Sequence, residues 1–209
     1  MDPPEWAGPG ADHPLFRRVA GAVCEQYDRD SSGHDMSHAW RVLALGTRIA
    51  DAEGADATVV GVAALVHDLH RAMGVAPRES LSAVEAALDA AGVPDEIAAA
   101  VRHPVAVHDD YSWEDDPASP DTAEAAVLRD ADNLDAMGAV GVARTFAFAG
   151  ATGQPFRAAE NTPIQHFHDK LLRLRGEMHT EAARELAEER HAFLETFLDR
   201  FEREHRGER

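Results

Sequence analysis

The segment from Ala57 to His70 constrains the fold most strongly, because it is apolar on nearly all sides and yet contains a histidine–aspartate pair. A helix that is apolar all round is predicted to lie at the centre of a bundle. Burying the imidazole of His67 and the carboxylate of Asp68 is costly unless each finds a partner. A divalent cation would satisfy both. Neighbouring residues of a helix point about 100° apart, so both can reach one ion only from a central position.

Apolar periodicity predicts helices in almost every segment of the 209-residue chain. The predicted helices cover residues 12–28, 35–52, 57–70, 80–91, 94–105, a stretch that begins at 121, 163–175 and 180–205. Residues 108–120 and 149–161 are predicted loops, and residues 1–11 are predicted to be a flexible tail. Because no alternating strand pattern of useful length occurs, we expect one all-α domain over residues 12–206, a helical bundle with its C-terminal helices packed on the core.

A second candidate for metal binding is His38, in the first turn of its predicted helix. Arg41 follows three residues later and therefore lies on the same helix face. A metal ligand and a guanidinium that pairs with phosphate could thus point into one cavity.

A third candidate is Asp132, in the stretch VLRDADNLDAM. Asp130 and Asp135 are close by, and three carboxylates within six positions repel one another unless some are neutralised. Asp121 and Glu124 resemble a capping box that starts this helix. Two imidazoles and two carboxylates form a donor set suited to a hard or borderline divalent cation, but this reasoning leaves open whether Asp130 or Asp132 is the ligand.

The composition limits the partners of the chain. The net charge of −18 at pH 7 repels nucleic-acid backbones, so we expect no nucleic-acid binding. A phosphate substrate would approach only a pocket made locally positive by a metal and inward-facing cations. The apolar runs are too short to span a bilayer, and the N-terminus lacks the features of a secretion signal. The single cysteine, Cys24, excludes an intrachain disulfide and a thiolate zinc site. A cytoplasmic location without membrane association is therefore expected.

The spacing of these residues resembles the H…HD…D pattern of the HD superfamily of metal-dependent phosphohydrolases. The resemblance runs from about residue 13 to residue 206. It includes the segments SSGHDMSHAWRV, AALVHDLHR, VLRDADNLDAMGAVGVARTFAFAG and NTPIQHFHDKLLRL, which are similar to successive blocks of the YedJ/YpgQ-like subgroup. Asp132 fits the alanine–aspartate stretch of that family, with Asp130 as the alternative.

The resemblance implies an all-α HD bundle in which His38, His67, Asp68 and Asp132 hold one divalent metal. Mn²⁺ is expected first, with Mg²⁺, Fe²⁺, Co²⁺, Ni²⁺ or Zn²⁺ as alternatives. The implied substrate is a nucleoside or deoxynucleoside triphosphate, cut to monophosphate and pyrophosphate. A 5′-nucleotidase or phosphodiesterase on the same metal, a di-iron oxygenase with two metals and a non-catalytic nucleotide-sensing module stay open.

In the expected mechanism, Asp68 or Asp132 helps to deprotonate the attacking water, and Arg41, Lys170 and Arg71 offset the charge on the phosphates. Lys170 is the only lysine of the chain. Arg71 stands where some HD nucleotidases carry a glutamate, so a mechanism that relies on that acid is not expected here.

Several further residues have weaker signals. His103 and His108 are candidates for a second metal, and Arg144 is a candidate phosphate partner. His166 and His168 are two positions apart and cannot share a helix face, so at most one of them is expected at the site. The apolar stripe of residues 180–205 either covers the core or forms a homodimer interface.

Overall fold

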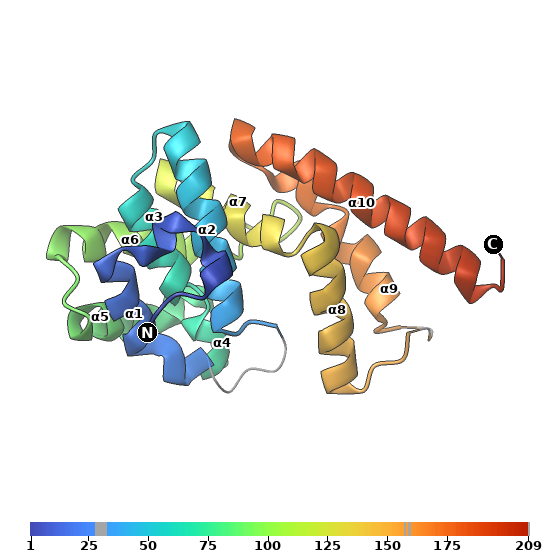
Figure 1. Ribbon diagram of the computed structural model, residues 1–209, viewed down its shortest axis with the longest axis horizontal. Helices are drawn as coiled ribbons and strands as arrows, with labels where there is room; N and C mark the ends of the chain where they lie inside the picture. Colours follow the sequence, from blue (N-terminus) through green and yellow to red (C-terminus); the bar gives the residue numbers. More distant parts are fainter. Residues whose placement is uncertain (28–32, 157, 159, 209) are drawn as a thin grey trace.

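The computed structural model describes residues 1–27, 33–156, 158 and 160–208. These residues form helices and connecting turns without any strand, which confirms the predicted all-α class (Figure 1). The elements are η1 (Glu5–Ala7), η2 (Pro9–Asp12), α1 (Pro14–Tyr27), α2 (Met36–Glu53), α3 (Ala57–Val66), α4 (Leu69–Met73), η3 (Pro77–Ser80), α5 (Leu81–Ala90), α6 (Asp95–Val107), α7 (Ala123–Asp135), α8 (Gly138–Thr152), α9 (Pro163–His166), η4 (Phe167–Leu171), η5 (Leu174–Glu177) and α10 (Glu181–His205).

Helix α3 is the centre of the bundle, as its uniform hydrophobicity predicts. Every residue from Val59 to Val66 is buried, and the helix contacts α1, α2, α6 and α7. Gly61 lets α1 approach closely, because a Cβ atom at this position would overlap the ring of Phe16. Helices α8, α9 and α10 lie together on the other side of α7 from this body (Figure 1).

The predicted helix 57–70 is wrong in one respect, because it breaks at the histidine–aspartate pair. Helix α3 ends at Val66, and Asp68 adopts φ −89° and ψ 6° before α4 begins at Leu69. The turn changes the direction of Asp68 relative to a continuous helix. Both His67 and Asp68 can therefore face the same point, which a regular helix makes difficult.

The helix that carries Asp132 begins differently from the expected capping box. Thr122, rather than Asp121, is the N-cap of α7, and its hydroxyl accepts a hydrogen bond from the amide of Ala125. Glu124 instead accepts a hydrogen bond from the amide of Asp56 at the start of α3. Glu124 thus binds the residue before α3 instead of the start of its own helix, α7.

The C-terminal part also departs from the sequence pattern. Helix α8 continues to Thr152, into the predicted loop 149–161, and ends at Gly153 with φ +69°. The predicted helix 163–175 is divided into α9, the π-helical turn η4 and the 3₁₀ turn η5.

The predictions for the N-terminal part of the chain differ less from the structure. In the expected tail 1–11, Ala7 and Ala11 are buried and the segment contacts α2. The predicted helix 12–28 appears as α1, and Asp28 lies outside the described residues.

Among the described residues, no single helix has the length and hydropathy needed to cross a membrane. The bent pair Ala57–Met73 and Pro77–Ala90 meets the criterion only when both parts are taken together, and these parts meet at 100°.

Candidate metal centre and substrate cavity

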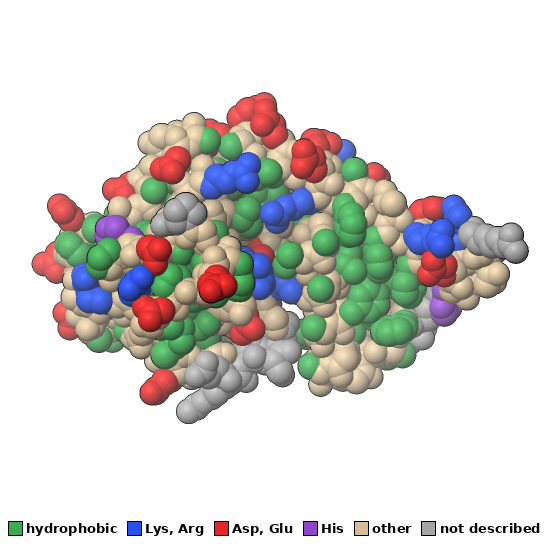
Figure 2. All heavy atoms as spheres, in the orientation of Figure 1, with side chains coloured by type: hydrophobic (Ala, Val, Ile, Leu, Met, Phe, Trp, Pro, Cys, Tyr) green, Lys and Arg blue, Asp and Glu red, His purple; other side chains and the backbone are tan. Residues whose placement is uncertain are grey.

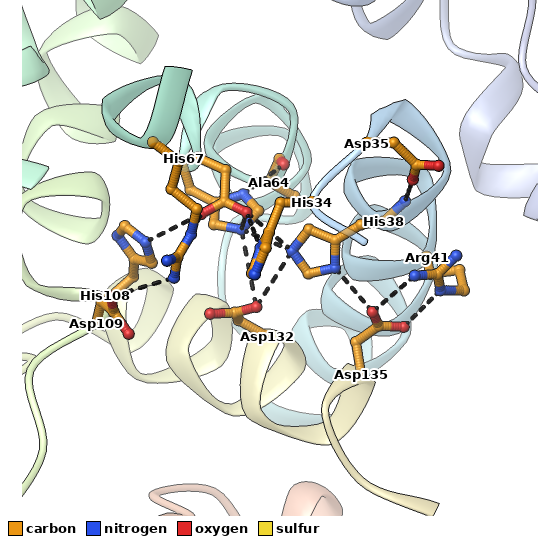
Figure 3. A network of polar contacts seen from close by, with 12 residues as sticks. His34, Asp35, His38, Arg41, Ala64, His67, His108, Asp109, Asp132 and Asp135 are labelled. Carbon is orange, nitrogen blue, oxygen red and sulfur yellow. Dashed lines mark hydrogen bonds and ion pairs between the residues drawn. The ribbon is translucent and has the colours of Figure 1, made fainter. Parts of the chain in front are cut away.

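Four side chains from three parts of the fold converge at the centre of the bundle (Figure 3). His38 Nε2, from α2, lies 3.2 Å from His67 Nε2 and 3.3 Å from Asp68 Oδ2. It also lies 3.3 Å from Asp132 Oδ1, on α7. His67 Nε2 lies 3.6 and 3.8 Å from the same two oxygens. Ligands that share a cation about 2.1 Å from each are roughly 3.0–3.5 Å apart, so these five distances approach the spacing of one coordination set. His38, His67 and Asp132 form a group whose ligand atoms all lie within 4.8 Å of one another.

The hydrogen bonds of the two histidines leave both Nε2 atoms facing the common centre. His67 Nδ1 donates to the carbonyl of Ala64 at 2.8 Å, and His38 Nδ1 donates to Asp135 Oδ2 at 2.7 Å. In the neutral rings, both Nε2 atoms therefore carry lone pairs. Two such lone pairs meet Asp132 Oδ1 and Asp68 Oδ2 in a buried space, where His34 is the donor to Asp68 Oδ2 among the described residues. A divalent cation fits this set, and the residues that would hold it are His38, His67, Asp68 and Asp132.

The charges of the cluster depend on one another. Burial lowers the pKa of His38, but its hydrogen bonds to Asp132, Asp135 and Asp68 outweigh burial and raise that pKa to about 10. Burial raises the pKa of Asp68 and of Asp132, but the surrounding histidines hold both pKa values well below the usual range. The carboxylates around His38 thus stabilise positive charge at this point of the core.

Asp135, which the sequence analysis named only as a carboxylate close to Asp132, binds His38 on the Nδ1 side of the ring. Besides His38, it accepts hydrogen bonds from Arg41 Nε at 2.7 Å, Arg41 Nη2 at 3.0 Å and Arg144 Nη1 at 2.7 Å. Burial raises its pKa, but these partners lower the pKa below its usual value. The expected phosphate ligand Arg41 thus lies behind His38, where it holds a partner of the metal ligand in place.

Asp130, the alternative ligand, points away from this cluster. It accepts hydrogen bonds from the amides of His179 and Thr180, both at 2.8 Å, and from the Thr180 hydroxyl at 2.7 Å. Burial raises the pKa of Asp130 to about 6 despite these donors. The side chain fixes the start of α10 on α7, so the geometry favours Asp132 as the metal ligand.

The residue that sequence reasoning missed at the centre is His34. Its Nδ1 lies 2.8 Å from Asp68 Oδ2 and 3.4 Å from Arg144 Nη2. With His38 and Asp68 it forms another group of ligand atoms close enough to hold a metal. His34 precedes the N-cap of α2, so no helical spacing could have indicated it.

His103 and His108, the candidates for a second metal, are separated by the structure. His103 Nε2 accepts a hydrogen bond from the amide of Asp121, away from the cluster. His108 is buried, and its Nε2 lies 3.9 Å from Asp68 Oδ1 without a hydrogen-bond partner among the described residues. His67, Asp68 and His108 form a further group that could hold a metal.

A cavity of about 370 Å³ lies beside the metal centre, between α4, α8 and the α9–η4 segment. Three cations line it: Arg71, Arg144 and Lys170. Arg71 Nε also donates to Asp68 Oδ1 at 2.8 Å, which connects this wall to the metal centre. Of the two C-terminal histidines considered above, His166 lines the cavity.

A second cavity, of about 980 Å³, lies between α1, α4 and α5. It shares His34, Arg71 and Phe148 with the first and also reaches Asp68. The second cavity therefore reaches the proposed ligand Asp68 directly, whereas the first meets it through His34 and Arg71.

The family of the chain follows from comparison with known proteins. The HD domain family matches residues 36–137, the stretch from α2 to the end of α7. The uncharacterized protein YpgQ of Bacillus subtilis (strain 168) is 42% identical over 179 residues, which cover 84% of this chain and 86% of YpgQ. This chain belongs to the HD superfamily of metal-dependent hydrolases.

Solved structures of HD proteins agree with this assignment. The crystal structure of B. subtilis YpgQ in complex with ADP has a TM-score of 0.74 and 38% identity, and the match covers 90% of this chain and 96% of that one. An HD-superfamily hydrolase from Bacillus thuringiensis has a TM-score of 0.69 and 30% identity, with coverage of 91% and 95%. The expected YpgQ-like HD subgroup is confirmed.

Proposed function

We propose that this HD hydrolase is a nucleotide pyrophosphohydrolase that converts a nucleoside or deoxynucleoside triphosphate to the monophosphate and pyrophosphate. One observation supports the proposal: Arg71, which donates to Asp68 of the candidate metal centre, also lines a cavity together with Arg144 and Lys170. In a chain of net charge −18, this cavity wall gathers three cations with a single carboxylate among its described residues, Asp169, and these cations can bind a polyphosphate.

The crystal structure of the relative YpgQ contains ADP, and a relative that binds this nucleotide supports a nucleotide as the substrate. The cavity of this chain also offers groups for the nucleoside. Gln154 and Asn161 line it with the three cations, and their amides can exchange hydrogen bonds with a base or a sugar.

A divalent ion, Mn²⁺ in our proposal, would bind phosphate oxygens and lower the pKa of a water. Asp132 is better placed than Asp68 to receive the proton of that water. Both oxygens of Asp68 are engaged, by Arg71 and by His34, whereas Asp132 Oδ2 has no hydrogen-bond partner among the described residues. Arg71, Arg144 and Lys170 would offset the charge that develops on the phosphates.

The test is a screen of purified protein with several divalent metals against triphosphates, monophosphates and cyclic dinucleotides. Pyrophosphate as the first product supports the proposal. Orthophosphate from monophosphates would instead establish a 5′-nucleotidase, and cleavage of the cyclic substrates a phosphodiesterase. Tight nucleotide binding without any product would establish a sensing module.

Variants of the metal centre test the site itself. His67→Ala and Asp68→Ala should lose metal retention and turnover together, because each removes one of four ligands. His103→Ala is the matched control, since His103 lies on α6 away from the cluster, and it should keep both. Full activity of a metal-free His67→Ala protein would refute the assignment.

A further inference from the structure

Asp109 connects two of the cavity cations that come from distant parts of the chain. Its Oδ2 lies 3.2 Å from Nη2 of Arg71, on α4, and its Oδ1 lies 3.8 Å from Nζ of Lys170, in η4. Asp109 is only 23% exposed, and the two cations are about one-third exposed, at 33% and 32%. A carboxylate between two cations in a partly buried position screens their repulsion and fixes both.

Lys170 is held from a second side by the loop that follows Asp109. Its Nζ lies 4.5 Å from the centroid of the buried Tyr111 ring. That ring stacks on Trp113 at 4.7 Å and 4°, and the Arg173 guanidinium covers Trp113 at 4.0 Å. The π-helical turn η4 sets the direction of Lys170, and π turns occur frequently at functional sites. The only lysine of the chain is therefore fixed between a carboxylate and an aromatic face.

Arg71 is fixed between Asp109 and the metal centre. Its Nε donates to Asp68 Oδ1 at 2.8 Å, while its Nη2 donates to Asp109. Burial lowers the pKa of Arg71, but the charges of Asp68 and Asp109 outweigh burial and raise that pKa. The geometry of Arg71 relative to the metal ligand is thus set at both ends of its guanidinium.

We propose that Asp109 is a positioning residue, which holds Arg71 and Lys170 in the fixed arrangement that the diphosphate part of the substrate requires. This inference rests on the proposed function, because it takes a polyphosphate as the substrate. Asp109 does not touch the reacting atoms. Its loss would leave both cations present but free to move, and a displacement of about 1 Å at a reacting group can lower a rate about 100-fold.

The kinetic test compares Asp109→Asn with Asp109→Glu and with the matched control Asp110→Asn. Asp110 is the adjacent carboxylate, but it pairs with Arg78, which is 60% exposed, and with the amide of Ala118. Asp109→Asn should lower kcat roughly 10- to 100-fold and raise KM less than about threefold, because positive charge still attracts the substrate. Asp109→Glu should recover part of kcat, and Asp110→Asn should match the wild type.

Either of two kinetic results would overturn the inference: a kcat of Asp109→Asn within about twofold of the wild type, or equal losses in Asp109→Asn and Asp110→Asn. Metal content and thermal stability, measured on the same samples, show whether a loss of kcat reflects unfolding. A purely structural role would lower the amount of folded enzyme without this division between kcat and KM.

A spectroscopic test does not depend on turnover. Because Lys170 is the only lysine, lysine labelled with ¹⁵N at Nζ gives one side-chain NMR signal, and the Tyr111 ring 4.5 Å away should shift that signal from its usual position. Asp109→Asn should move the signal toward the position of a free lysine, whereas Asp110→Asn should not. Inorganic pyrophosphate should shift the signal in the wild type and shift it less in Asp109→Asn.

The two tests separate the inference from the proposed function. If the wild type cleaves no triphosphate but its lysine signal responds to pyrophosphate in an Asp109-dependent manner, the positioning role stands and the assigned reaction fails. If triphosphates are cleaved and Asp109→Asn changes neither kcat nor the signal, the positioning role fails alone.

Discussion

The support of His38 by Asp135 predicts how strongly a residue outside the ligand set controls metal binding. In Asp135→Asn, one carboxylate oxygen becomes an NH₂ group. Asp135 accepts four hydrogen bonds, from His38, from Arg41 twice and from Arg144. The asparagine has a single oxygen to accept them, so at least one donor then faces another donor.

The expected loss can be estimated from comparable sites. Partners that orient a metal-binding histidine typically contribute 10- to 100-fold to metal affinity, which corresponds to about 1.4–2.7 kcal/mol. The stabilisation that saturating metal gives to the fold should decrease by the same amount. For a chain of this size, the metal-dependent rise in Tm should shrink by about 3–11 °C.

The measurement is titration calorimetry with Mn²⁺, together with thermal unfolding with and without the metal. Asp130→Asn is the matched control, because Asp130 is a buried aspartate on the same helix but binds the start of α10. This control should keep its metal affinity. Metal affinity in Asp135→Asn within about twofold of the wild type, or an equal loss in Asp130→Asn, would show that our account of His38 is wrong.

Two further predictions concern stability. The pKa of Asp130 rises on folding from 3.8 to about 6, so its contribution is present below about pH 4 and is lost as pH rises through 6. In urea titrations, the wild type should therefore lose up to about 3 kcal/mol relative to Asp130→Asn between these pH values. A relative gain over that range would mean that the amide donors of α10 outweigh burial. Gly61→Ala should cost about 1–3 kcal/mol, since the new methyl group overlaps the Phe16 ring, with metal affinity unchanged. Gly150→Ala, where a Cβ atom meets nothing within 4 Å, should instead stabilise the protein by about 0.5–1 kcal/mol in the same assay. Equal effects at the two glycines would contradict the packing argument.

The sequence by itself determined the all-α class, the buried central helix and the family pattern of histidines and aspartates. These features depend on short-range signals: apolar periodicity, and polar residues in a segment that must be buried. His67 and Asp68 stand out because polar side chains in a buried apolar segment are costly unless each has a binding partner. The sequence could not decide between Asp130 and Asp132, because both belong to the same helical stretch and have the same chemistry.

Only the tertiary structure decided which polar groups meet. His38 and Asp135 are 97 positions apart, and Asp68 and His34 are 34 apart. Such pairs depend on how helices cross, and no local pattern encodes those crossings. For the same reason Arg41 turned out to bind Asp135, while Asp109 came to lie between Arg71 and Lys170. The break of the central helix at His67 also depends on tertiary structure. Two neighbouring side chains reach one point only through a turn, and apolar periodicity does not predict that turn.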